Sequence, residues 1–260
     1  MTAYVFNIPF RDNKKLQHVI NKVKNDMKLR TLWKCSNVMA IDRMGYTDHG
    51  PTHVKIVANS ALKLLRILVD KKVVPSIVKN YGMKNEDAEM VVVLASIFHD
   101  LGMTVIRDGH ELYSALLASG FVEKYLQDIY SEEGRTIILS EVLHAIVSHE
   151  EPRKPLTLEA GIVRVADALD MEEGRARIPF QAGKVDIHSV SALSIEKVNI
   201  QEGDEKPVTV NITMSNSAGI FQIDELLKPR IENSGLGNYI HVVAEITRKE
   251  EQKILEKYEI

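Results

Sequence analysis

Cysteine is almost absent from this chain, since Cys35 is the only one among 260 residues. A single thiol cannot close an intramolecular disulfide, so the sequence excludes a secreted scaffold held together by disulfides. No catalytic signature surrounds Cys35. We therefore expect it to be a small buried residue rather than a nucleophile.

Long apolar runs, aromatic residues and an excess of one charge are also missing. No stretch approaches the roughly 20 apolar residues that a membrane-spanning helix needs, and the N-terminus has no basic start followed by the apolar core of a signal peptide. The formal net charge is −3, and aromatic residues make up 6% of the chain. These values argue against a long basic groove or a stacking platform for nucleic acid. We expect a cytoplasmic protein with no membrane contact and no long nucleic acid as partner.

A helical period dominates the first 180 residues. Apolar residues recur there at three- and four-residue steps, and Thr157 is placed to cap the last of the resulting segments. The spacing predicts helices at 14–32, 53–69, 85–100, 111–130, 135–149 and 156–171. We interpret residues 1–180 as one helical domain.

After Pro179 the period shifts toward two. Alternating apolar residues predict strands at 194–201, 207–214 and 239–247, a hairpin connection at 201–207, and a helix at 224–232. We interpret residues 181–260 as a small α+β unit, so that the whole chain is mainly α. Its apolar strands have edges that can pair with a second copy, which predicts a homodimer.

The strongest chemical signal is the doublet His99-Asp100, which ends an apolar run just before Gly102. Burying an imidazole or a carboxylate costs free energy unless the group is paired or binds a cation. Both side chains are good ligands for a divalent metal. The doublet therefore predicts a metal ion inside a helical core.

Further metal-ligating residue types stand at helix ends or at core-facing helical positions. Several helices can aim such residues at one point, as metal sites in helix bundles do. These residues are His53, His110, His149 and Asp167. His144 is an alternative to His149; the two lie five residues apart and face different sides of a helix, and His149 has the better context beside Glu150.

The order of His53, the doublet His99-Asp100 and Asp167 resembles the signature of the HD-domain superfamily of metal-dependent phosphohydrolases. The resemblance covers residues 45–175 and implies an HD-type helical bundle in which these four residues bind metal. Some members hold a second ion with two further histidines between the doublet and the last aspartate. His110 and His149 stand at those places, which implies two ions bridged by Asp100. No Gly-Tyr-Pro motif follows, so the branch defined by that motif and by cyclic dinucleotides is not indicated.

The resemblance and the ligand chemistry together predict a reaction. Mixed histidine and carboxylate ligands suit Mn, Fe, Co, Ni or Zn better than Mg or Ca. Two such ions can clamp a phosphate and activate a water, so we expect a metal-bound hydroxide to hydrolyse a phosphoester of a nucleotide or a short oligonucleotide. The catalytic candidates are Asp100, Glu150 and Arg164, and the substrate-binding candidates are Arg153, Lys154, Arg175 and Arg177. Asp108 and Asp170 are further candidates for proton transfer or for orienting a ligand.

Two alternatives stay open at this point. One is a single-strand nuclease, because some HD proteins cut single-stranded nucleic acid. The other is a regulatory metal-binding module whose C-terminal unit senses a ligand or dimerises. The residues do not show whether the enzyme would be a phosphomonoesterase or a phosphodiesterase.

Overall fold

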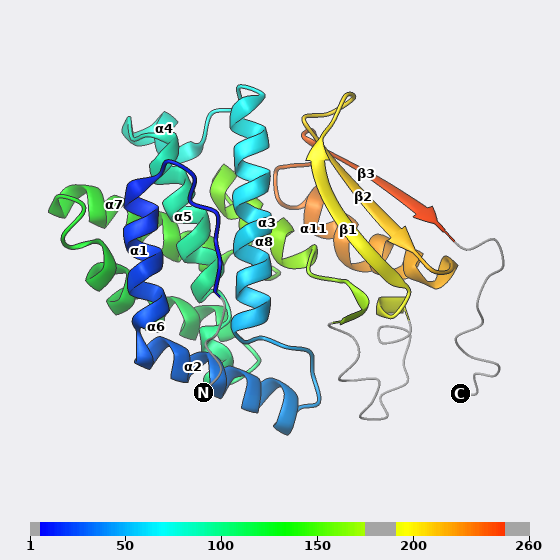
Figure 1. Ribbon diagram of the computed structural model, residues 1–260, viewed down its shortest axis with the longest axis horizontal. Coiled ribbons are helices and arrows are strands. Elements are labelled where there is room, and N and C mark those ends of the chain that lie inside the picture. Colours follow the sequence, from blue (N-terminus) through cyan, green and yellow to red (C-terminus); the bar gives the residue numbers. More distant parts are fainter. Residues whose placement is uncertain (1–5, 175–190, 248–260) are drawn as a thin grey trace.

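The helices come first along the chain and the sheet last. The computed structural model describes residues 6–174 and 191–247, and Figure 1 shows the helical part beside a sheet of three strands. The longer helices of the first part are α1 (Lys14–Asn25), α2 (Met27–Asn37), α3 (Pro51–Asp70), α5 (Asn85–Phe98), α6 (His110–Leu126), α7 (Glu132–Val147) and α8 (Leu158–Ala168). Shorter helices are η1 (Val38–Arg43), α4 (Ser76–Tyr81) and η2 (Leu101–Thr104). The mainly α fold with a small C-terminal α+β unit is thus confirmed.

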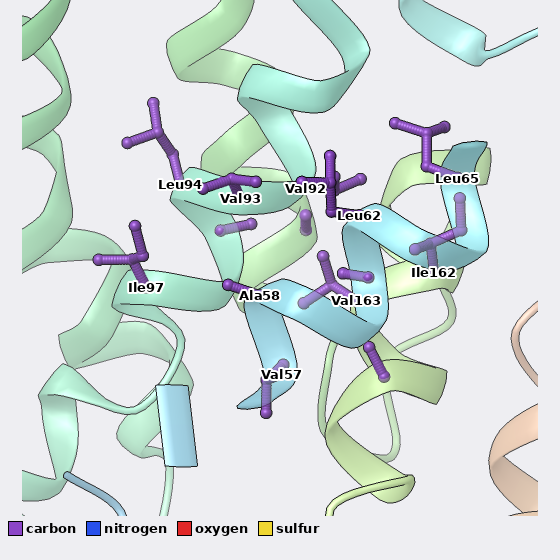
Figure 2. Packing of buried hydrophobic residues seen from close by; sticks show 14 of the residues in the cluster. Val57, Ala58, Leu62, Leu65, Val92, Val93, Leu94, Ile97, Ile162 and Val163 are labelled. Carbon is purple, nitrogen blue, oxygen red and sulfur yellow. The ribbon is translucent and has the colours of Figure 1, made fainter. Parts of the chain in front are cut away.

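Helix α5 forms the centre of the helical part. Its residues 90–98 are all buried, because its sequence is apolar on every face and other helices surround it. Helices α3 and α8 pack on it and on each other. Figure 2 shows this core, in which Leu62 of α3, Val92 of α5 and Ile162 of α8 are fully buried. Each such side chain contributes about 1.5–3 kcal/mol relative to an exposed position, so the core fixes the helix ends that carry the polar residues.

The sheet contains β1 (Ile195–Glu202), β2 (Val208–Met214) and β3 (Ile240–Ile246) in the order β1-β2-β3. Strands β1 and β2 are antiparallel through the predicted hairpin, with Val198 opposite Ile212. Strand β3 is parallel to β2, which requires a crossover. The crossover consists of η3 (Ser217–Gly219), η4 (Gln222–Leu227) and α11 (Lys228–Glu232). The sheet contacts α3, and α11 packs against α8.

One helix prediction was wrong: residues 14–32 form two helices, not one. The chain turns at Asp26, whose side chain accepts a hydrogen bond from the backbone N–H of Leu29 and so caps α2. The apolar spacing continues across the turn, because both helices bury one face on the same core. The six-residue helix α4 was not predicted, since it is too short to show a period.

The expectation for Cys35 was also wrong. Cys35 is exposed, because α2 buries the face that carries Leu29, Trp33 and Ser36, and Cys35 points to another side of the helix. Among the described residues, no helix is long and apolar enough to cross a membrane. The predicted domain boundary near residue 180 lies outside the described residues.

Candidate metal centre

Six predicted ligands come together in the structure, and all six lie at a helix end or within two residues of one. His53 is in the first turn of α3, and His99 and Asp100 follow the last residue of α5. His110 opens α6, and His149 follows α7. Asp167 is in the last turn of α8. The core thus presents one polar cluster, which we call the His/Asp centre: His53, His99, Asp100, His110, His149 and Asp167.

The carboxylate of Asp100 lies between two groups of histidines. Its Oδ2 atom is 3.2 Å from Nε2 of His53 and 3.2 Å from Nε2 of His99. Its Oδ1 atom is 3.2 Å from Nε2 of His110 and 3.9 Å from Nε2 of His149. Each oxygen therefore faces a different pair of imidazoles.

The last aspartate closes the first of these groups. Oδ1 of Asp167 is 3.2 Å from Nε2 of His53 and 3.6 Å from Nε2 of His99. Three overlapping sets of three residues have ligand atoms that all lie within 4.8 Å of one another. These sets are His53, His99 and Asp100; His99, His149 and Asp167; and Asp100, His110 and His149.

The outer nitrogens of the imidazoles are fixed by acceptors. Nδ1 of His99 lies 2.8 Å from the carbonyl oxygen of Ser96, and Nδ1 of His149 lies 2.6 Å from that of Ile146. A carbonyl can only accept, so Nδ1 carries a proton in either charge state, and in the neutral ring that binds a metal Nε2 presents its lone pair to the centre.

The same logic holds for His53, whose Nδ1 lies 2.6 Å from Oδ2 of Asp170. This contact agrees with the prediction that Asp170 orients a ligand. Nδ1 of His110 lies 2.9 Å from both the carbonyl oxygen and the Nη1 atom of Arg107, so its neighbours accommodate either tautomer.

The His/Asp centre fits a divalent cation because the groups that converge on it are acceptors. Nε2 of His53 and Nε2 of His99 are only 3.1 Å apart, and Nε2 of His110 and Nε2 of His149 are 3.3 Å apart. Lone pairs at such distances repel unless a proton or a metal ion lies between them. Buried carboxylates beside them need the same compensation.

The charges of the centre shift its pKa values in opposite directions. Burial lowers the pKa of His99, but Asp100 and Asp167 outweigh it and raise that pKa to about 9. Burial and the charge of His99 lower the pKa of His149 to about 4. Burial raises the pKa of Asp100, but the neighbouring histidines hold it well below its usual range. The carboxylate therefore stays ionised, as a metal ligand must.

Two comparisons bear on the identity of the chain. The sequence profile of the HD domain matches residues 52–172, a range that contains the whole His/Asp centre. The chain belongs to the HD-domain superfamily of metal-dependent phosphohydrolases. It is also 46% identical over 247 residues to an uncharacterized protein of Methanocaldococcus jannaschii, covering 94% of this chain and 95% of that relative. This similarity extends through the C-terminal unit, which the HD profile does not reach.

The predicted catalytic residues Glu150 and Arg164 are not among the six residues of the His/Asp centre. The guanidinium of Arg164 is 1% exposed, 3.0 Å from the carboxylate of Glu151, and donates to the carbonyl of Arg153 at 2.7 Å. Glu150 accepts from Nη2 of Arg230 at 2.9 Å. Arg164 thus anchors the segment after His149, and its catalytic role stays a prediction, like that of Glu150.

The predicted phosphate-binding residues are only partly described. Arg153 pairs with Glu111, in the first turn of α6, and Lys154 is exposed. Arg175 and Arg177 lie outside the described residues. His144 is the alternative to His149. Its Nε2 atom accepts a hydrogen bond from the backbone N–H of Leu156 at 3.0 Å, and it is not part of the His/Asp centre.

Sequence reasoning missed Arg230 of α11. Its Nη1 atom donates to the carbonyl of His149 at 2.6 Å and lies 3.8 Å from Oδ2 of Asp167. Burial lowers the pKa of Arg230, but Asp167 and Glu150 outweigh it, so the net shift is upward. No local pattern signals this contact, because the partners are more than 60 positions away in the chain.

Proposed function

We propose that this HD protein hydrolyses a phosphoester of a nucleotide or a short oligonucleotide at a dinuclear metal centre. One observation carries the dinuclear part: the two oxygens of Asp100 face different pairs of histidines, at 3.2 Å from His53 and His99 and at 3.2 and 3.9 Å from His110 and His149. A carboxylate placed in this way is suited to bridge two cations.

The ligands divide accordingly. One ion would be held by His53, His99, Asp100 and Asp167, and the other by Asp100, His110 and His149. Mixed nitrogen and oxygen donors suit Mn, Fe, Co, Ni or Zn. When bound, two such ions neutralise phosphoryl charge and supply a nucleophile from water at neutral pH.

The protein's own part is to hold the ligands and to keep their tautomers fixed. Asp170 and the carbonyls of Ser96 and Ile146 keep three imidazoles with their lone pairs inward. Arg153 and Lys154 lie four and five residues after His149 and are the described cations that we propose for the substrate phosphate. Arginine binds phosphate through two parallel hydrogen bonds, whereas lysine acts as a point charge.

The test is a product assay on Mn-loaded protein with nucleoside monophosphates, nucleoside triphosphates, cyclic dinucleotides and short single-stranded oligonucleotides. Wild type is compared with His99→Ala, which removes one ligand from the buried centre. Hydrolysis of a nucleotide by wild type alone supports the proposal. Cleavage of oligonucleotides only at internal positions would favour the nuclease. A metal-loaded protein that cleaves none of these compounds would refute the proposal and favour a regulatory module.

A further inference from the structure

Arg230 connects the C-terminal unit to the His/Asp centre. It lies on α11, beyond the HD match, which ends at residue 172. Its side chain is 20% exposed and makes three polar contacts there. Nη1 donates to the carbonyl of His149 at 2.6 Å, Nη2 donates to Oε2 of Glu150 at 2.9 Å, and Nη1 lies 3.8 Å from Oδ2 of Asp167.

Two of these contacts fall on the outer side of proposed metal ligands. Asp167 has its Oδ1 atom toward His53 and His99, and its Oδ2 atom toward Arg230. His149 turns its ring to the centre and its carbonyl to the same guanidinium. One side chain thus ties the last residues of α8 to the turn after α7. Residues that hold metal ligands from outside are what give a metal centre its geometry.

The position of Arg230 is itself fixed by close packing of the backbone. A Cβ atom at Gly161 of α8 would collide with the carbonyl oxygen of Ser234, which closes the turn after α11. The glycine therefore lets the C-terminal unit approach α8 directly. Leu236 packs at the same place and is buried. The close packing of Gly161 against Ser234 and Leu236 thus places the guanidinium of Arg230 beside the His/Asp centre.

The charge of Arg230 attracts it to Glu150 and Asp167 but does not by itself explain the fixed orientation of its guanidinium. A cation beside a metal centre repels metal ions, but Glu150 at 2.9 Å offsets that charge. The orientation is explained by the planar array of N–H donors, which reaches the carbonyl of His149 and the carboxylate of Glu150 at once. Lysine lacks such an array.

We propose that Arg230 is a positioning residue that holds Asp167 and the His149–Glu150 turn in metal-binding geometry, so that the C-terminal unit completes the His/Asp centre. This proposal rests on the proposed metal centre and deepens it. It makes residues outside the HD domain necessary for metal affinity.

The test is a calorimetric titration of the full chain with Mn²⁺, at a temperature where circular dichroism shows each variant folded. Arg230→Gln removes the contacts, and Glu150→Gln/Arg230→Gln removes them without changing the net charge. We expect both to bind Mn²⁺ about 10- to 100-fold more weakly than wild type. Arg230→Lys, which keeps the charge but not the array of donors, should fall in between. Lys228→Met should match wild type, because Lys228 lies on the same helix with a 60% exposed side chain whose ion pair with Asp224 is 3.9 Å long.

Co²⁺ absorption reports on the coordination geometry and should change in the two Gln variants but not in Lys228→Met. Wild-type affinity in the charge-neutral double variant would overturn the proposal. So would equal losses in Arg230→Gln and Lys228→Met, because that result would indicate a general effect on the junction. The readout is independent of catalysis: a wild type that binds Mn²⁺ but hydrolyses nothing overturns the proposed activity and leaves this test intact.

Discussion

Asp26 separates α1 from α2 and offers a sharp test of how the helical part is held together. Its Oδ1 atom accepts from the backbone N–H of Leu29 at 3.1 Å, and its Oδ2 atom accepts from the hydroxyl of Tyr125 at 2.9 Å and from Nζ of Lys124 at 2.8 Å. The Tyr125 side chain is buried, whereas the Lys124 side chain is 63% exposed. One carboxylate thus caps α2 and ties it to α6.

These contacts set the magnitude expected for Asp26→Ala. Loss of the helix cap costs about 1 kcal/mol. A buried Tyr125 hydroxyl without its acceptor costs about 1–3 kcal/mol more. The exposed Lys124 adds about 0–1 kcal/mol. We expect the free energy of unfolding to fall by about 2–5 kcal/mol, measured by urea denaturation at pH 7.

A double-mutant cycle isolates the contact with the hydroxyl. Tyr125→Phe removes the group that Asp26→Ala leaves unpaired, so the aspartate substitution should cost about 1–3 kcal/mol less in the Phe background. An equal cost in both backgrounds, or a cost below about 1 kcal/mol in the wild-type background, would refute the reasoning. Asp26→Asn is the matched control, because asparagine also caps helices well.

The pH dependence follows from the same contacts. Burial raises the pKa of Asp26, but its hydrogen bonds from Lys124, Leu29 and Tyr125 outweigh it, and the pKa lies below its usual value. The folded state therefore binds the proton less tightly than the unfolded state. The stabilisation is complete above the unfolded-state value of about 3.9 and is lost as the pH falls through the folded-state pKa. The gap between wild type and Asp26→Ala should narrow below about pH 4.

Three further predictions concern the centre and its surroundings. Asp100→Ala should lose nearly all bound metal and His110→Ala about one ion of two, as read by elemental analysis; unchanged metal content in both would refute the bridging role. Gly102→Ala should cost about 1–3 kcal/mol in urea denaturation and weaken the second ion, because its Cβ would collide with the carbonyl of His110; wild-type stability would contradict this close approach. Burial and the charge of Glu159 raise the pKa of Glu141, so wild-type stability should fall as the pH rises above about 4.3, the unfolded-state value; Glu141→Gln should remove that fall, and parallel pH profiles would count against it.

The sequence was informative about the centre because its residues conflict with their surroundings. A histidine and an aspartate at the end of the apolar helix α5 need a partner, and the need is visible without coordinates. The strands of the C-terminal unit were predicted for a similar reason, since Val208, Val210, Ile212 and Met214 alternate with polar residues and are buried on one face. In each case the local pattern contains the information.

The features that were missed depend on contacts between distant parts of the chain. Asp26 caps α2 locally, but the apolar spacing continues across the turn, and its bonds from Lys124 and Tyr125 of α6 cannot be read from the local sequence. The parallel pairing of β2 with β3 is set by the crossover and not by the strands themselves. Arg230 cannot be told from other arginines by its neighbours in the sequence, because its contacts form only through the packing of α11 on α8. The spacing of apolar residues along the chain does not reveal contacts between residues that are far apart in the sequence.

The histidines of the centre show how local and distant specification combine. His99, His110 and His149 each direct Nδ1 at the carbonyl three residues earlier, so a single turn of chain orients each ring. His53, in the first turn of α3, directs Nδ1 instead at the carboxylate of Asp170, 117 positions away. This difference has a consequence for the order of assembly. Three rings are oriented as soon as their helix ends form, whereas His53 acquires its fixed tautomer only when α3 and the end of α8 have packed together. The packing of these two helices therefore couples the formation of the core to the completion of the metal centre.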